Sequence, residues 1–491
     1  MADWKNVIGL EVHVQLKTKT KLFCACPVET GARPNSHVCP VCLGMPGALP
    51  TVNAQALEYA IRLGLALHCE IDPRPMWTRK NYFYPDLPKG YQVTQTGGLP
   101  YYDHPVCKNG WLDIELEDGT TRRIGITRIH MEEDAGKLIH DMSPSESHFD
   151  ANRCGTPLCE IVSEPDIRTA KEAVAYLTKL KQIVEYTGVG DADMEKGNLR
   201  CDANISIRPS EDAPFGTRAE IKNLNSFTHL EKAVEAEREL QIVTLESGGV
   251  VEQCTKRYDV ANNRTIVIRT KEDAFDYRYF PEPDLPRLTV TPELVEKVRA
   301  SLPELPEDRR KRFVDALGLT AYDARVLCAE KPVADWFERA AAASPNPKLV
   351  ANWMMTEVLR EARTGADGAT IPASQGLPNL KFSPEQLGEL VALIEKGTIS
   401  SKIAKTVFAE MVSAGESPEA IVKAKGLVQV SDVGAITEAV RKVVEANPAP
   451  LEALKAGNAK LRGFFVGQVM KAMAGKGNPA LINQALDGFL K

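Results

Sequence analysis

A proline-rich segment at residues 278–286 divides this chain into two parts with different patterning. The segment, RYFPEPDLP, holds three prolines in nine residues, so it cannot continue a helix or an inner strand. Before it, short apolar runs alternate with polar residues and are separated by Gly, Pro, Asn and Asp. After it the apolar spacing is helical, beginning at Thr291-Pro292, a typical helix start. We therefore expect an α+β region followed by a helical region.

The length of 491 residues predicts several domains, since one domain commonly takes roughly 150 residues. We expect a domain at residues 1–290, a helical domain at 291–408, and a small helical tail domain at 409–491 that glycines and prolines punctuate. Within the first domain, apolar spacing predicts helices at residues 169–186 and 229–247, each ending at glycine. The remainder should form a mostly antiparallel sheet.

Two segments of this first domain alternate strictly, which indicates strands with one apolar and one polar face. In residues 10–16, Glu11, His13 and Gln15 fall on one face and four apolar residues on the other. In residues 201–207, Asp202 and Asn204 share the polar face. An antiparallel sheet that packs one face on a core and leaves the other polar fits this pattern.

Composition and charge narrow the class of protein. Hydrophobic residues make up 43% and charged residues 26%, as in ordinary globular proteins, and neither a signal peptide nor a membrane span is evident. We therefore expect a cytoplasmic protein. The net charge of −6 argues against strong non-specific nucleic-acid binding. Residues 411–491 nevertheless hold ten Lys and Arg against seven acidic residues, which is compatible with an RNA-contacting tail or with a solvated helical surface. The candidate contacts are Lys460, Arg462, Lys471 and Lys476.

Four cysteines lie within 19 positions near the N-terminus and predict a structural zinc site. Cys24-x-Cys26 is followed after twelve residues by Cys39-x-x-Cys42 and a nearby glycine. Four thiolates form a closed tetrahedral site that leaves no open position for a substrate. The Cys-x-Cys spacing is shorter than usual, so four unliganded buried thiols are the alternative. The seven other cysteines are scattered, and we expect them in the core.

Acidic residues recur beside apolar strand residues and suggest a Mg²⁺ site. Buried carboxylates need a counter-charge, and a shared cation is one solution, although any single one is more often solvated or paired with a base. The candidates are Glu11, Glu132, Glu133, Glu160, Asp202 and Glu220, with His13 on the same strand as Glu11.

Residues 79–91 combine basic and aromatic side chains that suit a nucleotide. Lys80 and Lys89 could hold phosphates, whereas the aromatics Tyr82, Phe83, Tyr84 and Tyr91 could stack on a base, with core packing the better expectation for most of them. Neither of the two common glycine-rich phosphate motifs is present, so a nucleotide site of those types is excluded.

Six motifs closely resemble the B-subunit family of the aspartyl/glutamyl-tRNA amidotransferases, and the resemblance runs from end to end. They occupy residues 8–15, 79–86, 130–137, 200–206, 221–227 and 276–284. The resemblance implies a glutamine-synthetase-like cradle domain, then a helical domain and a tail that contacts tRNA. It also implies a glutamine-dependent carbon–nitrogen ligase, in which ATP phosphorylates the side-chain carboxylate of misacylated Glu-tRNA(Gln) or Asp-tRNA(Asn) and ammonia then displaces the phosphate.

The family resemblance further implies cofactors, partners and residue roles. Besides ATP, these are Mg²⁺ and, in some members, Zn²⁺ on the four cysteines. Because this sequence lacks an evident glutaminase, ammonia should come from an A subunit, in a heterotrimer completed by a C subunit. The implied Mg²⁺ ligands are Glu11, His13, Glu133, Glu160 and Glu220. Asp202 is a further catalytic candidate, and Lys80, Lys89, Asn204 and Lys222 are candidate cofactor-binding residues.

Two other functions fit parts of the sequence. A non-catalytic, zinc-stabilised tRNA-binding scaffold explains the cysteines and the basic tail, but not acidic side chains that would repel phosphate without a cation. A ligase acting on a free amino acid explains the carboxylates, but leaves the helical half without a purpose. ATP turnover that requires Glu-tRNA, and that free glutamate does not support, would separate these hypotheses.

Overall fold

The computed structural model describes residues 3–96, 102–116, 118–139, 146–270, 277–365, 368–429, 432–473 and 476–490. The described chain separates into two compact units, Met1–Leu305 and Pro306–Lys491. Each unit has hydrophobic cores of its own. Asp276 of the last family motif lies outside the described residues.

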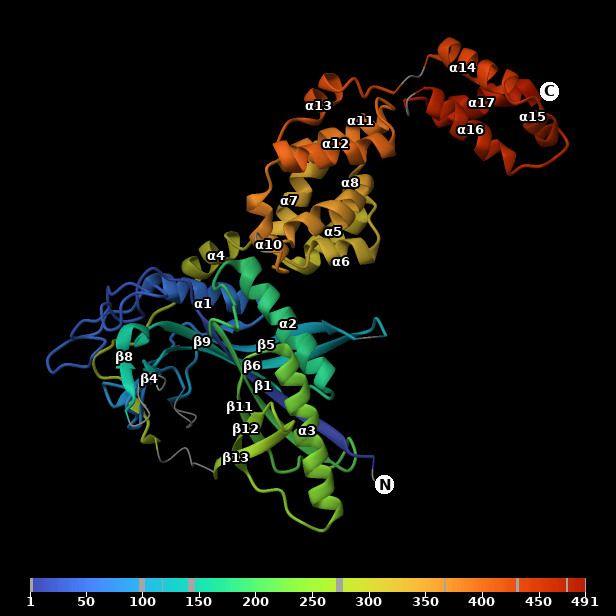
Figure 1. Cartoon of the computed structure of the whole chain (residues 1–491). Helices are drawn as coiled ribbons and strands as arrows, with labels where there is room; N and C mark the ends of the chain where they lie inside the picture. Colours follow the sequence, from blue (N-terminus) through green and yellow to red (C-terminus); the bar gives the residue numbers. More distant parts are fainter. Residues whose placement is uncertain are drawn as a thin grey trace. The chain divides into compact units, whose positions relative to one another are not determined.

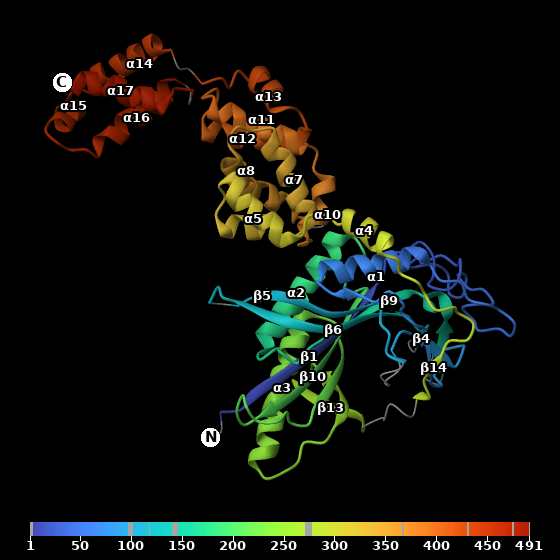
Figure 2. The ribbon, with the colours of Figure 1, turned by 180° about the vertical axis from the view of Figure 1, so that it is seen from behind.

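The first unit is built on a nine-stranded sheet (Figures 1 and 2). All neighbouring strands are antiparallel except β11 (Ala219–Leu224) and β12 (Cys254–Asp259), which pair in parallel. The predicted mostly antiparallel sheet is thus confirmed. In spatial order the strands are β13 (Arg264–Thr270), β12 (Cys254–Asp259), β11 (Ala219–Leu224), β10 (Leu199–Arg208), β1 (Lys5–Gln15), β9 (Pro157–Ser163), β6 (Thr121–Glu133), β5 (Cys107–Glu115) and β2 (Glu70–Ile71).

Helices cover one face of this sheet and form the core with it. Helix α2 (Ala170–Thr187) lies beside α3 (Phe227–Glu246), as both views show, and α1 (Ala54–Ala66) packs on α2. The apolar residues of β1 point into this core, where Leu10 and Val12 meet the buried residues of the helices. The polar face of the sheet is therefore on the other side, as the alternation predicts.

The sequence signals at the helix ends are also confirmed. The Thr169 side chain accepts a hydrogen bond from the backbone of Glu172 at the start of α2, and Gly188 ends the helix with a φ of 69°. Thr291 caps α4 (Pro292–Ala300), whose Val298 belongs to the core of the first unit.

The described part of the first unit also contains two smaller sheets. One contains β14 (Phe280–Pro281), β3 (Thr78–Asn81) and β4 (Tyr91–Thr94), and another pairs β7 (Lys137–Ile139) with β8 (His148–Asp150). The loop between β3 and β4 exposes 82% of Phe83 and 58% of Tyr84. Core packing was the better expectation for most aromatics of this segment, and for Phe83 and Tyr84 it is wrong, because both lie in the connection between β3 and β4 and not in a strand.

The second unit consists mainly of helices. One core is formed by buried residues between Phe313 and Val422, and a second by residues between Ile436 and Leu486. Their helices are α5 (Pro306–Leu317), α6 (Ala321–Leu327), α7 (Lys331–Ala342), α8 (Pro347–Trp353), α9 (Leu359–Ala362), α10 (Ala373–Gly376), α11 (Pro384–Glu395), α12 (Ser401–Ala414), α13 (Pro418–Ala424), α14 (Val433–Glu445), α15 (Pro448–Lys455), α16 (Leu461–Ala472) and α17 (Pro479–Leu490).

The α+β class is confirmed, whereas the division at residues 290 and 408 stays a prediction. In the tail, Phe465 is fully buried while Phe464 stays 38% exposed. Arg462 pairs with Asp487. Among the described residues, no helix is long and apolar enough to cross a membrane.

Candidate active site

The polar face of the nine-stranded sheet gathers acidic and histidine side chains from five neighbouring strands, β11, β10, β1, β9 and β6. On β1, Glu11 lies opposite Asp202 of β10, and His13 lies opposite Glu160 of β9. Glu160 in turn lies opposite His130 of β6. Residues directly opposite in neighbouring strands point to the same side of a sheet, so these side chains meet on one surface.

The first cluster contains His13, Glu132, Glu160 and His130. The Nε2 atom of His13 lies 3.3 Å from Glu132 and 3.2 Å from Glu160. Ligand atoms of His13, Glu132 and Glu160 all lie within 4.8 Å of one another, so one metal ion could contact all three. His130 approaches the same two carboxylates, at 3.4 Å from Glu160 and 3.7 Å from Glu132.

Opposite charges in this cluster shift the pKa values of its histidines and carboxylates. Burial disfavours the charged imidazoles, but the contacts with Glu132 and Glu160 prevail and raise the pKa of His13 well above its usual range. The same two carboxylates raise the pKa of His130 to about 8. Burial acts against ionisation of Glu132 as well, yet the two histidines lower its pKa to about 2. The carboxylates therefore stay charged at neutral pH and are available as ligands.

The second cluster contains Glu11, Asp202 and Glu220, whose ligand atoms also lie within 4.8 Å of one another. The ammonium of Lys222 lies 2.7 Å from Glu220 and 3.0 Å from Asp202. Asn204 donates a hydrogen bond of 3.1 Å to Glu11. Burial, followed by the charges of Glu160 and Glu220, raises the pKa of Glu11, as crowded carboxylates without enough positive charge would.

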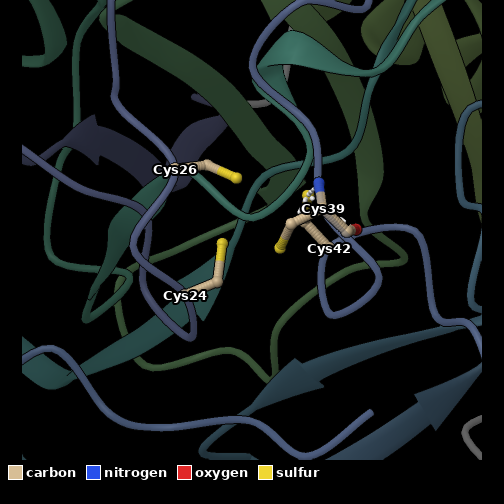
Figure 3. Close-up of side chains that lie close together, drawn as sticks. All are labelled: Cys24, Cys26, Cys39 and Cys42. Carbon is tan, nitrogen blue, oxygen red and sulfur yellow. Dashed lines mark hydrogen bonds between the residues drawn. The ribbon is translucent and has the colours of Figure 1, made fainter.

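The four N-terminal cysteines converge as their spacing predicts. Figure 3 shows the sulfurs of Cys24, Cys26, Cys39 and Cys42 directed toward one another, and they lie within 4.8 Å. The backbone N–H of Cys39 points at the sulfur of Cys42 at 3.2 Å. The set therefore fits a tetrahedral all-sulfur site. The other seven cysteines are all buried, as expected.

A buried lysine accompanies the cysteines. The Lys21 side chain is fully buried, donates to the carbonyl of His37 and lies 3.6 Å from the Cys42 sulfur. Hydrogen bonding from Cys24 lowers the pKa of Cys42 to about 4, and Lys21 acts in the same direction. One cation next to four thiolates would offset part of their charge.

Glu133 belongs to neither carboxylate cluster. Its carboxylate pairs with Lys89 and accepts a hydrogen bond of 2.9 Å from the backbone of Val93. Glu133, Lys89 and Cys42 line a cavity of about 220 Å³ between the cysteine loop and the small sheet. The ammonium group of Lys80 lies over the Tyr277 ring, 4.8 Å from the ring centre.

Glu132 was one of the acidic candidates for the Mg²⁺ site, but it was not among the ligands that the family resemblance implies, and His130 had no assigned role. The signal was available, since His130 and Glu132 are two residues apart on β6 and share a face, while Glu133 points elsewhere.

Comparison with known proteins identifies relatives over the full length. The GatB/GatE catalytic domain matches residues 6–296, and the GatB domain matches residues 335–490. Proteins named as the B subunits of aspartyl/glutamyl-tRNA(Asn/Gln) amidotransferases are similar throughout. The one from Persephonella marina is 54% identical over 100% of both chains, and the one from Carboxydothermus hydrogenoformans is 52% identical over 99% of this chain and 98% of its own. That of Geobacter sulfurreducens is 54% identical over 100% of both chains.

Proposed function

This chain belongs to the GatB/GatE family, and from that premise we propose that it is the ATP-dependent B subunit of a multi-subunit amidotransferase that converts Glu-tRNA(Gln), Asp-tRNA(Asn) or both to the amides. The observation that supports this most is the similarity over nearly the whole length of chains with that name. The carboxylate-rich face of the sheet is the site where we propose that the reaction occurs.

The reaction requires activation of a carboxylate. A carboxylate is a poor acyl donor because oxide would have to leave, whereas an acyl phosphate releases phosphate readily. ATP transfers its γ-phosphoryl group to the side-chain carboxylate, forming a new O–P bond and releasing ADP. Ammonia then attacks the acyl carbon, phosphate departs with the C–O bonding electrons, and an amide remains after loss of a proton.

The two carboxylate clusters are proposed to bind Mg²⁺. Their donor sets fit, since each offers at least two carboxylates and an excess of negative charge. When bound, Mg²⁺ would offset the charge of phosphates approaching an anionic substrate. The proposed ligands are His13, Glu132 and Glu160 in one cluster and Glu11, Asp202 and Glu220 in the other.

The neighbouring residues of the second cluster hold these ligands in place. Lys222 contacts Asp202 and Glu220 together and so keeps the two carboxylates close. Asn204 fixes one oxygen of Glu11, which leaves the other oxygen for a cation. The roles of Lys80 and Lys89 toward the phosphates of ATP, and of Glu133 toward Mg²⁺, remain predictions.

Zinc and the partner subunits complete the proposal. One Zn²⁺ on Cys24, Cys26, Cys39 and Cys42 would stabilise the loop without taking part in the reaction, because no ligand position stays open.

Ammonia would come from a glutaminase A subunit, with a C subunit completing a heterotrimer. The tail domain, residues 409–491, would contact the body of the tRNA through its basic residues.

An ATP hydrolysis assay tests the function. The purified chain is combined with A and C subunits, and phosphate release is measured with Glu-tRNA(Gln), with uncharged tRNA and with free glutamate. We expect turnover with Glu-tRNA(Gln) alone. Turnover with free glutamate would indicate a ligase for the free amino acid, and tRNA binding without any turnover would indicate a scaffold.

A further inference from the structure

Lys21 is a fully buried lysine next to the four-cysteine cluster, and the proposed reaction gives it no role. Its exposed fraction is 0%. The ammonium nitrogen lies 2.8 Å from the carbonyl oxygen of His37, 3.3 Å from that of Ala151 and 3.6 Å from the sulfur of Cys42. An ammonium has three N–H groups, so each can meet one of these acceptors.

The charge of Lys21 has no carboxylate partner in the part of the chain that the structure describes. The carboxylates that line the adjoining cavity pair with other bases. These pairs are Glu133 with Lys89, Glu282 with Arg79 and Asp284 with Arg79. Lysine is almost never fully buried without a counter-charge, because an uncompensated buried charge is strongly unfavourable.

Metal-bound cysteines would supply the missing counter-charge. The four sulfurs point toward one another and lie within 4.8 Å (Figure 3). Four thiolates around Zn²⁺ carry two more negative charges than the metal neutralises. A buried cation beside this anionic group stabilises it and is stabilised in return.

Contacts on both sides fix the position of Lys21. Its backbone N–H donates to the carbonyl of Cys26 at 3.0 Å. Its ammonium joins the carbonyl of His37, within the cysteine loop, to that of Ala151, which lies 130 positions from Lys21 in the sequence. The charge is therefore held against the Cys42 sulfur by contacts that do not involve a metal.

We propose that Lys21 is the outer-sphere cation of the four-cysteine zinc site: its ammonium donates to the sulfur of Cys42, offsets part of the charge of the four thiolates and so strengthens zinc binding. Partners of this kind typically change metal affinity about 10–100-fold. This inference rests on the proposed zinc site and not on the reaction that the chain catalyses.

Zinc affinity measures this role. The intact chain is loaded with Zn²⁺, and the metal is competed away with a chelator of known affinity. In Lys21→Met, which replaces the ammonium with an apolar group, zinc affinity should fall about 10–100-fold. Lys19→Met is the control, since Lys19 is exposed and two positions away, and it should bind zinc as the wild type does. Equal affinity of Lys21→Met and the wild type would overturn the proposal.

Two further measurements separate this role from core packing. If Lys21 only filled space, Lys21→Met would lower the Tm equally in zinc-loaded and zinc-free protein, and that result would overturn the proposal. We expect the larger loss in the zinc-loaded protein, because all four sulfurs are then thiolates. With Co²⁺ in place of zinc, the sulfur-to-metal charge-transfer band should move to longer wavelength in Lys21→Met, since the sulfur electrons lose a positive neighbour. An unchanged band would contradict a contact with the metal-bound sulfur.

Lys21→Met could fail to fold, so two other variants are measured with it. Lys21→Gln keeps a donor without the charge and should lose affinity, whereas Lys21→Arg keeps the charge and should retain more of it. The reverse order would overturn the role of the charge. A wild-type chain that binds no zinc would reject the zinc site itself, whereas zinc binding that is equal with and without Lys21 would reject only the role of Lys21.

Discussion

The two carboxylate clusters lie on the same face of one sheet, yet they differ in what balances their charge. In the first, the positive partners are the imidazoles of His13 and His130, which are also able to ligate a metal. In the second, the partner is Lys222, which holds two carboxylates but cannot ligate while protonated.

The two clusters overlap in burial, but Lys222 and its partner Glu220 are the more exposed charge pair. The side chains of Glu132 and Glu160 are 7% and 14% exposed and that of Asp202 is 10% exposed, whereas Glu220 is 24% and Lys222 30% exposed. A buried ion pair depends strongly on each partner, because removing one leaves an uncompensated charge. The first cluster should therefore tolerate substitution less well than the second.

The largest effect is expected for Glu160→Gln, since Glu160 contacts both histidines. Amidation should fall about 10²–10³-fold, through loss of a charge that would bind the cation. The rate is measured as Gln-tRNA formed from Glu-tRNA with ammonia supplied directly. Ammonia production by the A subunit serves as the control and should be unchanged. Amidation near the wild-type rate at ordinary Mg²⁺ would refute the assignment.

Two variants test whether Glu132 or Glu133 is a ligand of the cation in the first cluster. Glu132→Gln should weaken divalent-cation binding about 10–100-fold, because Glu132 contacts both histidines and Glu133 contacts neither. In Glu133→Gln, the carboxylate lost is the partner of Lys89, and cation affinity should change less. Calorimetric titration of both variants decides between them. Equal losses of affinity would place Glu133 among the ligands.

The second cluster should respond more mildly. Glu220→Gln should raise the Mg²⁺ concentration needed for half-maximal amidation about tenfold, because Lys222 can still pair with Asp202. High Mg²⁺ should restore most of the rate. If it restores none while the protein remains folded, Glu220 acts in some way other than cation binding.

A smaller effect is expected when residues 409–491 are removed, since these residues lie apart from both clusters in sequence. The KM for aminoacyl-tRNA should rise about threefold to tenfold, and the dependence of affinity on salt should become shallower. The turnover rate at saturating tRNA should be retained. A truncated protein that folds and keeps the original KM would show that the basic residues do not contact tRNA.

The smallest effect on catalysis is expected at the four cysteines. Removing zinc with a chelator should lower the Tm by a few degrees, about 2–4 °C for each kcal/mol of lost stability, because the metal holds the loop together. Amidation at 25 °C should change less than about twofold, as expected for a closed structural site. Zinc analysis before chelation should give about one ion per chain. Absence of metal with all four thiols freely reactive would contradict the site.

The sequence alone determined much of the local structure. Thr169 and Gly188 mark the ends of α2, and the alternation in β1 assigns Leu10 to the core and Glu11 to the polar face. These signals are local, since caps and strand alternation depend only on neighbouring residues. The cysteine spacing was sufficient to predict the four-cysteine cluster for the same reason. Four ligands within one loop can meet without contacts from distant strands.

Only the tertiary structure separated the acidic residues into two sites. Alternation places Glu132 and Glu133 on opposite faces of β6, but it cannot tell which face meets His13. That choice follows from strand order and register, which put β9 between β1 and β6 and bring His130 opposite Glu160. Register is set by packing of the whole sheet on its helices, so contacts between residues more than a hundred positions apart are decided by the fold and not by any one segment.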